Sequence, residues 1–226
     1  MIEQLARRGY GYGSGMLSPD CSKFIVSMPK NASSYMVDWA SRHRWSSAVV
    51  GDSCDWHLIQ EMIVILRDPV DRWISGMAQY LNTYILSVVG PNGPIYNASD
   101  ATVYDKKLTA EDWISQYNQL TERIIFDQIS RFDDHTWPQC ELFESILPAV
   151  TRKYFYLDKD FDQTISAYLN FAPYNDLDQN SKHANQNIKK LHEFFQHRLN
   201  IRPELKQRVI DAYAQDYKII KQVFNQ

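Results

Sequence analysis

The sequence predicts an α/β protein with a short parallel sheet and a helical C-terminal half. Two apolar, β-rich runs, Phe24–Met28 and Met62–Leu66, have the composition of strands that are buried on both faces. Each run is followed by a polar loop and then by a helical pattern, which is the order that produces a βαβ unit. The 226 residues can bury a substantial core, and we expect a single domain over 1–226.

The N-terminal half is expected to alternate strands with helices after an irregular arm. Residues 1–22 form that arm, because glycines alternate there with tyrosine and serine. Apolar residues at helical spacing predict a helix over 35–44, and Ala48–Val50 is a second short strand. After the run Met62–Leu66, an aspartate–proline pair supplies the N-cap and the first-turn proline of a helix over about 70–87.

The rest of the chain is expected to be mainly helical. Glycine and proline residues predict an inserted loop over 88–107, and a polar loop is expected over 175–187. One further strand is predicted over 153–157. Helical patterns occupy the segments 110–130, 138–147 and 161–169, and a last helix begins at Pro203.

The composition argues against several classes of function. A net charge of −3 and a pI near 6.1 disfavour nucleic acid as the main partner. The three cysteines are far apart and form no CxxC pair, so we expect reduced thiols and no metal site. No stretch approaches the roughly 18 apolar residues of a membrane span, and the first residues lack the apolar run of a signal peptide. We therefore expect a soluble, cytoplasmic protein without a membrane partner.

An unusual loop follows the first apolar run. It reads Pro-Lys-Asn-Ala-Ser-Ser and leads directly into a predicted helix. Main-chain N–H groups at a helix N-terminus, together with Lys30, Ser33 and Ser34, would form a cradle for an oxyanion. The GxxxxGK[ST] pattern of a Walker A loop is absent. Taken alone, the segment also fits an ordinary strand-to-helix turn.

A second unusual loop follows the other apolar run. Arg67 ends that run, where its guanidinium could grip a phosphate with two hydrogen bonds, and Ser75 lies eight positions later on the next helix. The alternative is that Arg67 pairs with Asp71 and that Ser75 only permits close packing. Loops that follow parallel strands lie along one edge of the sheet, where α/β proteins bind ligands. We therefore expect the two loops to lie together.

Together, the two loops resemble the motifs of the sulfotransferases that use 3′-phosphoadenosine 5′-phosphosulfate (PAPS). Those enzymes carry Pro-Lys-x-Gly-[Thr/Ser]-[Thr/Ser] after one strand and Arg-Asp-Pro-x-x-Arg-x-x-Ser after another. This chain departs from the first motif at Ala32, where the family has a glycine that permits positive φ. The resemblance implies that a 5′-phosphosulfate is bound by Lys30, Asn31, Ala32, Ser33 and Ser34. It also implies that Arg67 and Ser75 bind the 3′-phosphate.

Two further segments resemble the carbohydrate sulfotransferases more loosely. The segment 133–139 is similar to their Asp-x-His-x-x-Pro-Gln sequence, and the segment from Pro203 to Tyr217 is similar to their last helix. The resemblance implies a P-loop-like fold of three layers. It also implies two partners, a nucleotide co-substrate and a small-molecule or glycan acceptor.

The chemistry of sulfuryl transfer assigns roles to several residues. Catalysis is mainly positioning and stabilisation of developing charge, and Lys30 is placed by the resemblance to stabilise the bridging oxygen of the leaving nucleotide. A base must take the proton of the acceptor hydroxyl, and the candidates are Asp52, His57 and His135. No metal is expected. The alternatives are a degenerate relative that only binds nucleotide or glycan, and a P-loop kinase.

Overall fold

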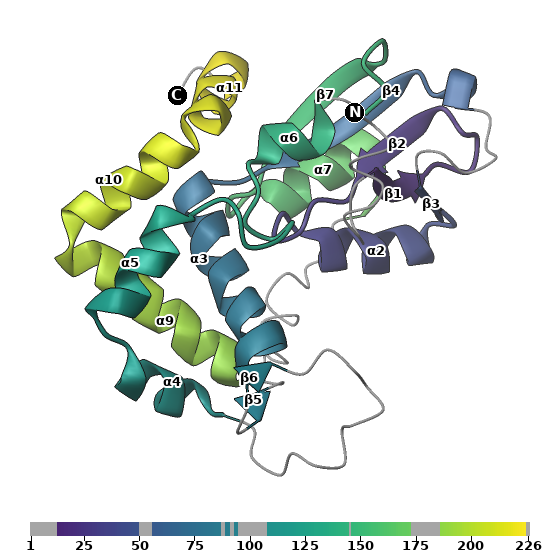
Figure 1. Ribbon diagram of the computed structural model, residues 1–226. Helices are drawn as coiled ribbons and strands as arrows, with labels where there is room; N and C mark the ends of the chain where they lie inside the picture. Colours follow the sequence, from purple (N-terminus) through teal and green to yellow (C-terminus); the bar gives the residue numbers. More distant parts are fainter. Residues whose placement is uncertain are drawn as a thin grey trace. The chain divides into compact units, whose positions relative to one another are not determined.

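The computed structural model describes residues 13–49, 56–86, 89–90, 93–94, 108–144, 146–172 and 186–224 (Figure 1). The chain divides into two compact units, which are considered separately here. The sheet unit consists of the described parts of 1–69, 137–183 and 214–226, and the helical unit of those of 70–136 and 184–213. The single domain over 1–226 stays a prediction.

The sheet unit is built on five strands in the order β3-β1-β2-β4-β7. Three strands are parallel, with β4 (Glu61–Leu66) paired to β2 (Lys23–Val26) on one side and to β7 (Thr151–Tyr156) on the other. Strand β1 (Ser14–Leu17) pairs antiparallel with β2 and with β3 (Ser46–Val49). The predicted α/β class is confirmed, but the sheet is mixed and only its β2-β4-β7 part is parallel.

The predicted irregular arm is wrong for its last part, which contains strand β1. Gly15 lies so close to β2 that an added Cβ would be 2.2 Å from the Ile25 carbonyl oxygen and 2.5 Å from the Phe24 ring. Glycine suggested an irregular segment in the sequence, because it weakens most strands. Here the lack of a side chain is what allows two strands to pack this closely. Residues 1–12 lie outside the described part of the chain.

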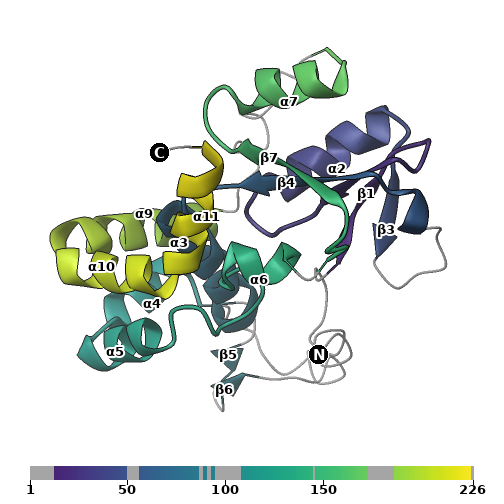
Figure 2. The ribbon, with the colours of Figure 1, turned by 90° about the horizontal axis from the view of Figure 1, so that it is seen from above.

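Helices cover both faces of the sheet and give the sheet unit three layers (Figure 2). Helices α2 (Ser33–Arg42) and α7 (Phe161–Leu169) pack on one face, against the odd-numbered residues of β4. Helices α6 (Gln139–Phe143) and α11 (Ala214–Phe224) pack on the other, against the even-numbered residues. Because successive side chains of a strand point to opposite faces, both sets must be apolar. This explains the unbroken apolar run that the sequence shows.

The helical unit surrounds a second core, whose largest side chains include Trp73, Phe126 and Phe195. Its helices are α3 (Pro69–Tyr80, followed by a π-helical segment over Leu81–Leu86), α4 (Ala110–Gln116), α5 (Gln119–Asp127), α9 (Gln186–Ile201) and α10 (Pro203–Ala212). This unit also contains the short strands β5 (Val89–Gly90) and β6 (Gly93–Pro94), while a 3₁₀ turn at Trp56–Leu58 belongs to the sheet unit. The other residues of the predicted inserted loop lie outside the described part of the chain.

Several predicted helices have different limits in the structure. The helix predicted over 110–130 is two helices, because the side chain of Asn118 accepts hydrogen bonds from the N–H groups of Leu120 and Thr121 and starts α5. The last helix is also divided, between α10 and α11. Helix α9 was not predicted, since its buried residues Leu191, Phe195 and Leu199 are spaced four apart in a polar sequence. The predicted helix over 138–147 spans only α6.

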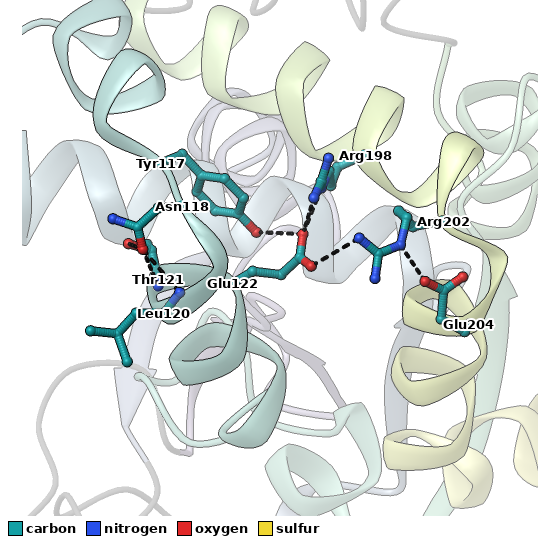
Figure 3. A network of polar contacts seen from close by, with 8 residues as sticks. All are labelled: Tyr117, Asn118, Leu120, Thr121, Glu122, Arg198, Arg202 and Glu204. Atoms are coloured by element: carbon teal, nitrogen blue, oxygen red, sulfur yellow. Dashed lines mark hydrogen bonds and ion pairs between the residues drawn. The ribbon is translucent and has the colours of Figure 1, made fainter.

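A buried carboxylate joins α5 to α9 and to the start of α10 (Figure 3). Glu122 of α5 accepts a hydrogen bond from Nε of Arg198 at 2.6 Å and is paired with Nη1 of Arg202 at 3.2 Å. The hydroxyl of Tyr117 donates to the same carboxylate at 3.3 Å. Burial and the negative charge of Glu122 raise the pKa of Tyr117 above its ordinary value. The Glu122 carboxylate thus has two charged partners and one neutral donor, all within the helical unit.

Candidate functional site

The two predicted loops begin at the same edge of the sheet. Strands β2 and β4 are parallel and in register from Lys23 opposite Glu61 to Ile25 opposite Ile63. The carboxyl ends of both strands therefore lie at one edge, as the sequence predicted. Arg67, which follows β4, donates a hydrogen bond from Nη1 to the main-chain carbonyl of Lys30 at 3.2 Å. Residues of the two motifs are thus in direct contact.

The loop after β2 has an unusual backbone. Lys30 and Ala32 are both in the left-handed region, with φ values of 67° and 59°. Ala32 therefore adopts the conformation that glycine favours, although its Cβ makes this conformation less stable by about 1–2 kcal/mol. The N–H of Asn31 donates to the carbonyl of Met28 at 3.1 Å and closes the turn.

Helix α2 begins without a side-chain cap. Its N-cap residue, Ala32, has no oxygen to offer to the first N–H groups, and the first turn contains no acidic residue. The first N–H groups of a helix have no partner within the helix and carry a partial positive charge. Ser33 is half-buried and Ser34 is exposed in this first turn. The arrangement is suited to an anion.

The side chain of Asn31 has a structural role in the loop, while its predicted part in nucleotide binding stays a prediction. Its side chain is buried, and its Nδ2 donates to the main-chain carbonyl of Ile65 at 2.7 Å and to Oε1 of Gln139. These bonds direct the amide toward β4. The Asn31 side chain therefore fixes the loop against the sheet.

Gln139, at the start of α6, is fully buried and connects both loops. Its side-chain amide accepts from the main-chain N–H of Arg67 and donates to the main-chain carbonyl of Arg67, both at 2.9 Å. Asp216 of α11 accepts from the main-chain N–H groups of Gln139 and Cys140, at 2.8 and 2.9 Å. Sequence reasoning assigned no role to Gln139 or Asp216. Their only signal was that both lie in segments that resemble the carbohydrate sulfotransferases.

The other predicted site residues are not assembled at this edge by the described contacts. Ser75 lies on α3 in the helical unit, and its partnership with Arg67 stays a prediction. Asp52 lies outside the described residues. His57 is exposed on the 3₁₀ turn that precedes β4, so it lies near the amino end of that strand. Lys30 and Arg67 follow the carboxyl ends.

His135 belongs to a small charged cluster in the helical unit. Its Nδ1 is 2.9 Å from a carboxylate oxygen of Asp133 and 3.2 Å from one of Asp134. Burial disfavours the charged imidazolium, but the hydrogen bonds and charges of the two aspartates outweigh it and raise the pKa of His135 to about 9. The histidine is therefore protonated at neutral pH and cannot accept a proton there.

The same cluster contains the only group of three potential metal ligands among the described residues. One ligand atom from each of Asp133, Asp134 and His135 lies within 4.8 Å of the others. A metal would have to displace the proton of the imidazolium that joins the two carboxylates. Close packing holds the segment, since Arg72 donates to the carbonyl of Asp134 at 3.0 Å and an added Cβ at Gly76 would be 2.3 Å from the His135 carbonyl oxygen. The cluster is suited to a structural ion pair.

Comparison with known proteins assigns this chain to no family. No family model matches the chain, and no curated protein or solved structure matches it. No helix of the described residues is long and apolar enough to cross a membrane. A function must therefore be inferred from the chemistry of the sheet edge.

Proposed function

We propose that the protein is a sulfotransferase that moves a sulfuryl group from PAPS to an acceptor hydroxyl, most favourably on a carbohydrate. One observation carries the proposal. The Arg67 guanidinium donates to the main-chain carbonyl of Lys30 at 3.2 Å, so the two motifs meet at the carboxyl edge of two parallel strands. The fold would then be P-loop-like, with the loop between β2 and α2 in the place of the phosphate loop.

The first loop would bind the 5′-phosphosulfate. The uncapped N–H groups at the start of α2 and the hydroxyls of Ser33 and Ser34 would hold its oxygens. Lys30 would lie beside the bridging oxygen. The acceptor oxygen attacks sulfur in line, a new S–O bond forms, and the bond between sulfur and the bridging oxygen breaks. The electron pair of that bond goes to the bridging oxygen, where the Lys30 ammonium would stabilise the negative charge.

The second loop would select the nucleotide. Arg67 has a planar guanidinium that can form two parallel hydrogen bonds with a phosphate, and Ser75 would add a hydroxyl. Together they would distinguish a 3′-phosphorylated nucleotide from ATP and from 5′-AMP. This selection requires no metal.

The proton of the acceptor hydroxyl must be taken by a base. His135 is protonated at neutral pH, with a pKa of about 9, and His57 lies near the opposite end of β4. We therefore propose Asp52, which the sequence places just after the residues of β3, as the base.

Calorimetric titration with 3′-phosphoadenosine 5′-phosphate tests the nucleotide site directly. We expect micromolar binding without magnesium, and no comparable heat with 5′-AMP or ATP. Equal binding of all three nucleotides would contradict the role of Arg67. Binding of ATP that requires magnesium would favour a P-loop kinase instead.

The catalytic role is tested by Lys30→Ala. We expect PAPS turnover with a panel of sugar acceptors to fall at least about 100-fold, because a charge that stabilises the transition state is lost. Alanine keeps the Cβ and therefore the backbone requirements of this left-handed position. Lys221→Ala, on the exposed side of α11, is the matched control and should be as active as the wild type. Unchanged turnover in Lys30→Ala would contradict the catalytic role of Lys30. Nucleotide binding without turnover in the wild type would favour a protein that only binds its ligands.

A further inference from the structure

Strand β4 extends further than β2, its neighbour on one side. Its pairing with β2 ends with Ile63 opposite Ile25, whereas its pairing with β7 continues to Leu66. Main-chain groups of alternate residues in a strand point to opposite neighbours. The carbonyl of Leu66 points to the β7 side, where it accepts from the N–H of Leu157 at 2.7 Å. The main-chain groups of Ile65 and Arg67 therefore point to the side on which β2 has ended.

Two side-chain amides take the place of the missing strand. Asn31 Nδ2 donates to the Ile65 carbonyl at 2.7 Å, and Gln139 bonds to both the N–H and the carbonyl of Arg67 at 2.9 Å. Buried main-chain groups without partners are strongly unfavourable, so these amides complete the ladder. A two-point contact also fixes the peptide groups on both sides of Arg67. It thereby sets the direction in which the Arg67 side chain leaves the backbone.

The orientation of the Gln139 amide is itself determined by its surroundings. Its oxygen accepts from two donors, the Arg67 N–H and Asn31 Nδ2. Its nitrogen donates to the Arg67 carbonyl and lies 3.5 Å from Oδ2 of Asp216. The reversed amide would place oxygen against oxygen and nitrogen against nitrogen. Gln139 is thus held in one orientation while it holds Arg67 and Asn31.

We infer that Gln139 is a positioning residue that fixes Arg67 and the loop after β2 for recognition of a 3′-phosphorylated nucleotide. The ligand in this inference rests on the proposed function, whereas the positioning rests on the contacts alone. Gln139 is fully buried and acts through its neighbours, so it need not touch the nucleotide.

The test is the isosteric substitution Gln139→Glu, with Gln60→Glu as a matched control at an exposed glutamine of the same unit. The new carboxylate cannot donate to the Arg67 carbonyl and lies beside Asp216, whereas the protonated carboxyl group can donate as the amide does. We expect Kd for 3′-phosphoadenosine 5′-phosphate to be raised about tenfold at pH 9 and to approach the wild-type value at pH 5.5. Gln60→Glu should match the wild type at every pH.

A second measurement separates the positioning from the nucleotide. Hydrogen exchange of the Arg67 amide should be at least about tenfold faster in Gln139→Ala than in the wild type, with thermal melting as a check that the variant is folded. Unchanged exchange, or a ratio of Kd values independent of pH, would overturn the positioning role. If the wild type binds no 3′-phosphorylated nucleotide, the proposed function fails, and the exchange of the Arg67 amide still decides whether Gln139 positions this residue.

Discussion

Two charged clusters of the helical unit and the carboxyl edge of the sheet are held together by different kinds of contact. In the helical unit the contacts join opposite charges, with Glu122 between two arginines and His135 between two aspartates. At the carboxyl edge of the sheet, the neutral amides of Asn31 and Gln139 bond to main-chain groups of β4. The first arrangement pairs ionised side chains with one another, whereas in the second the amide side chains bond to main-chain groups.

This difference predicts that the two regions respond to different changes. Ion pairs contribute according to the protonation of both partners, and removal of one partner leaves a charge uncompensated. Neutral amides position the two loops without adding charge beside Lys30 and Arg67. Changes of charge and pH should therefore affect mainly the stability of the helical unit. Changes of amide or backbone geometry should affect mainly the sheet edge.

The largest effect is expected for Glu122→Ala, which removes the carboxylate shared by Arg198 and Arg202. We expect the free energy of unfolding to fall by about 3 kcal/mol, because two guanidinium groups lose their common partner. Urea unfolding followed by circular dichroism measures this loss. The control Glu204→Ala removes an exposed partner of Arg202 and should change stability only slightly. Equal losses in the two variants would show that burial of Glu122 has no special role.

A smaller effect is expected from the titration of His135. Its pKa is raised to about 9 in the folded protein from an ordinary value of 6.5. The stabilisation is therefore fully present below pH 6.5 and is lost as the pH rises through 9. The full shift corresponds to about 3 kcal/mol, and because the imidazole is partly exposed, screening by solvent reduces the expected loss to about 2 kcal/mol. Urea unfolding between pH 6 and 9.5 should show this fall. His135→Gln should abolish it, whereas His57→Gln, which changes an exposed histidine, should retain it. A fall that persists in His135→Gln would assign the titration to another group.

The smallest effect concerns the backbone of the sheet edge. Ala32→Gly should raise the free energy of unfolding by about 1 kcal/mol, because glycine adopts a φ of 59° without the penalty of a Cβ. Ala167→Gly, at an exposed position within α7, should lower it by a similar amount, since glycine is unfavourable inside a helix. Chemical denaturation of the two variants compares the signs. A loss of stability in both would mean that the left-handed loop conformation does not persist in solution.

Much of the sheet unit could be predicted because local patterns agree with the tertiary structure. The apolar, β-rich runs identified β2 and β4. The rule that loops after parallel strands share one edge of the sheet predicted that Lys30 and Arg67 lie close together. Strand β1 escaped prediction because its Gly15 is required by close packing against β2, a contact between segments that the local pattern does not contain. Helix α9 was not predicted from the sequence, because only a narrow face of this helix is apolar.

Local sequence patterns were sufficient to establish the α/β class, the main strands, and the residue types and spacing of the two loops. These follow from periodicity and from residues whose backbone preferences are local. The tertiary structure alone decided that the Asn31 side chain points to β4. It also decided that Gln139, which follows Arg67 by 72 positions, completes the ladder beside that residue. A side-chain amide can replace a strand only where the end of a neighbouring strand leaves main-chain groups exposed to it. That condition arises from the register of the sheet, which no local pattern records.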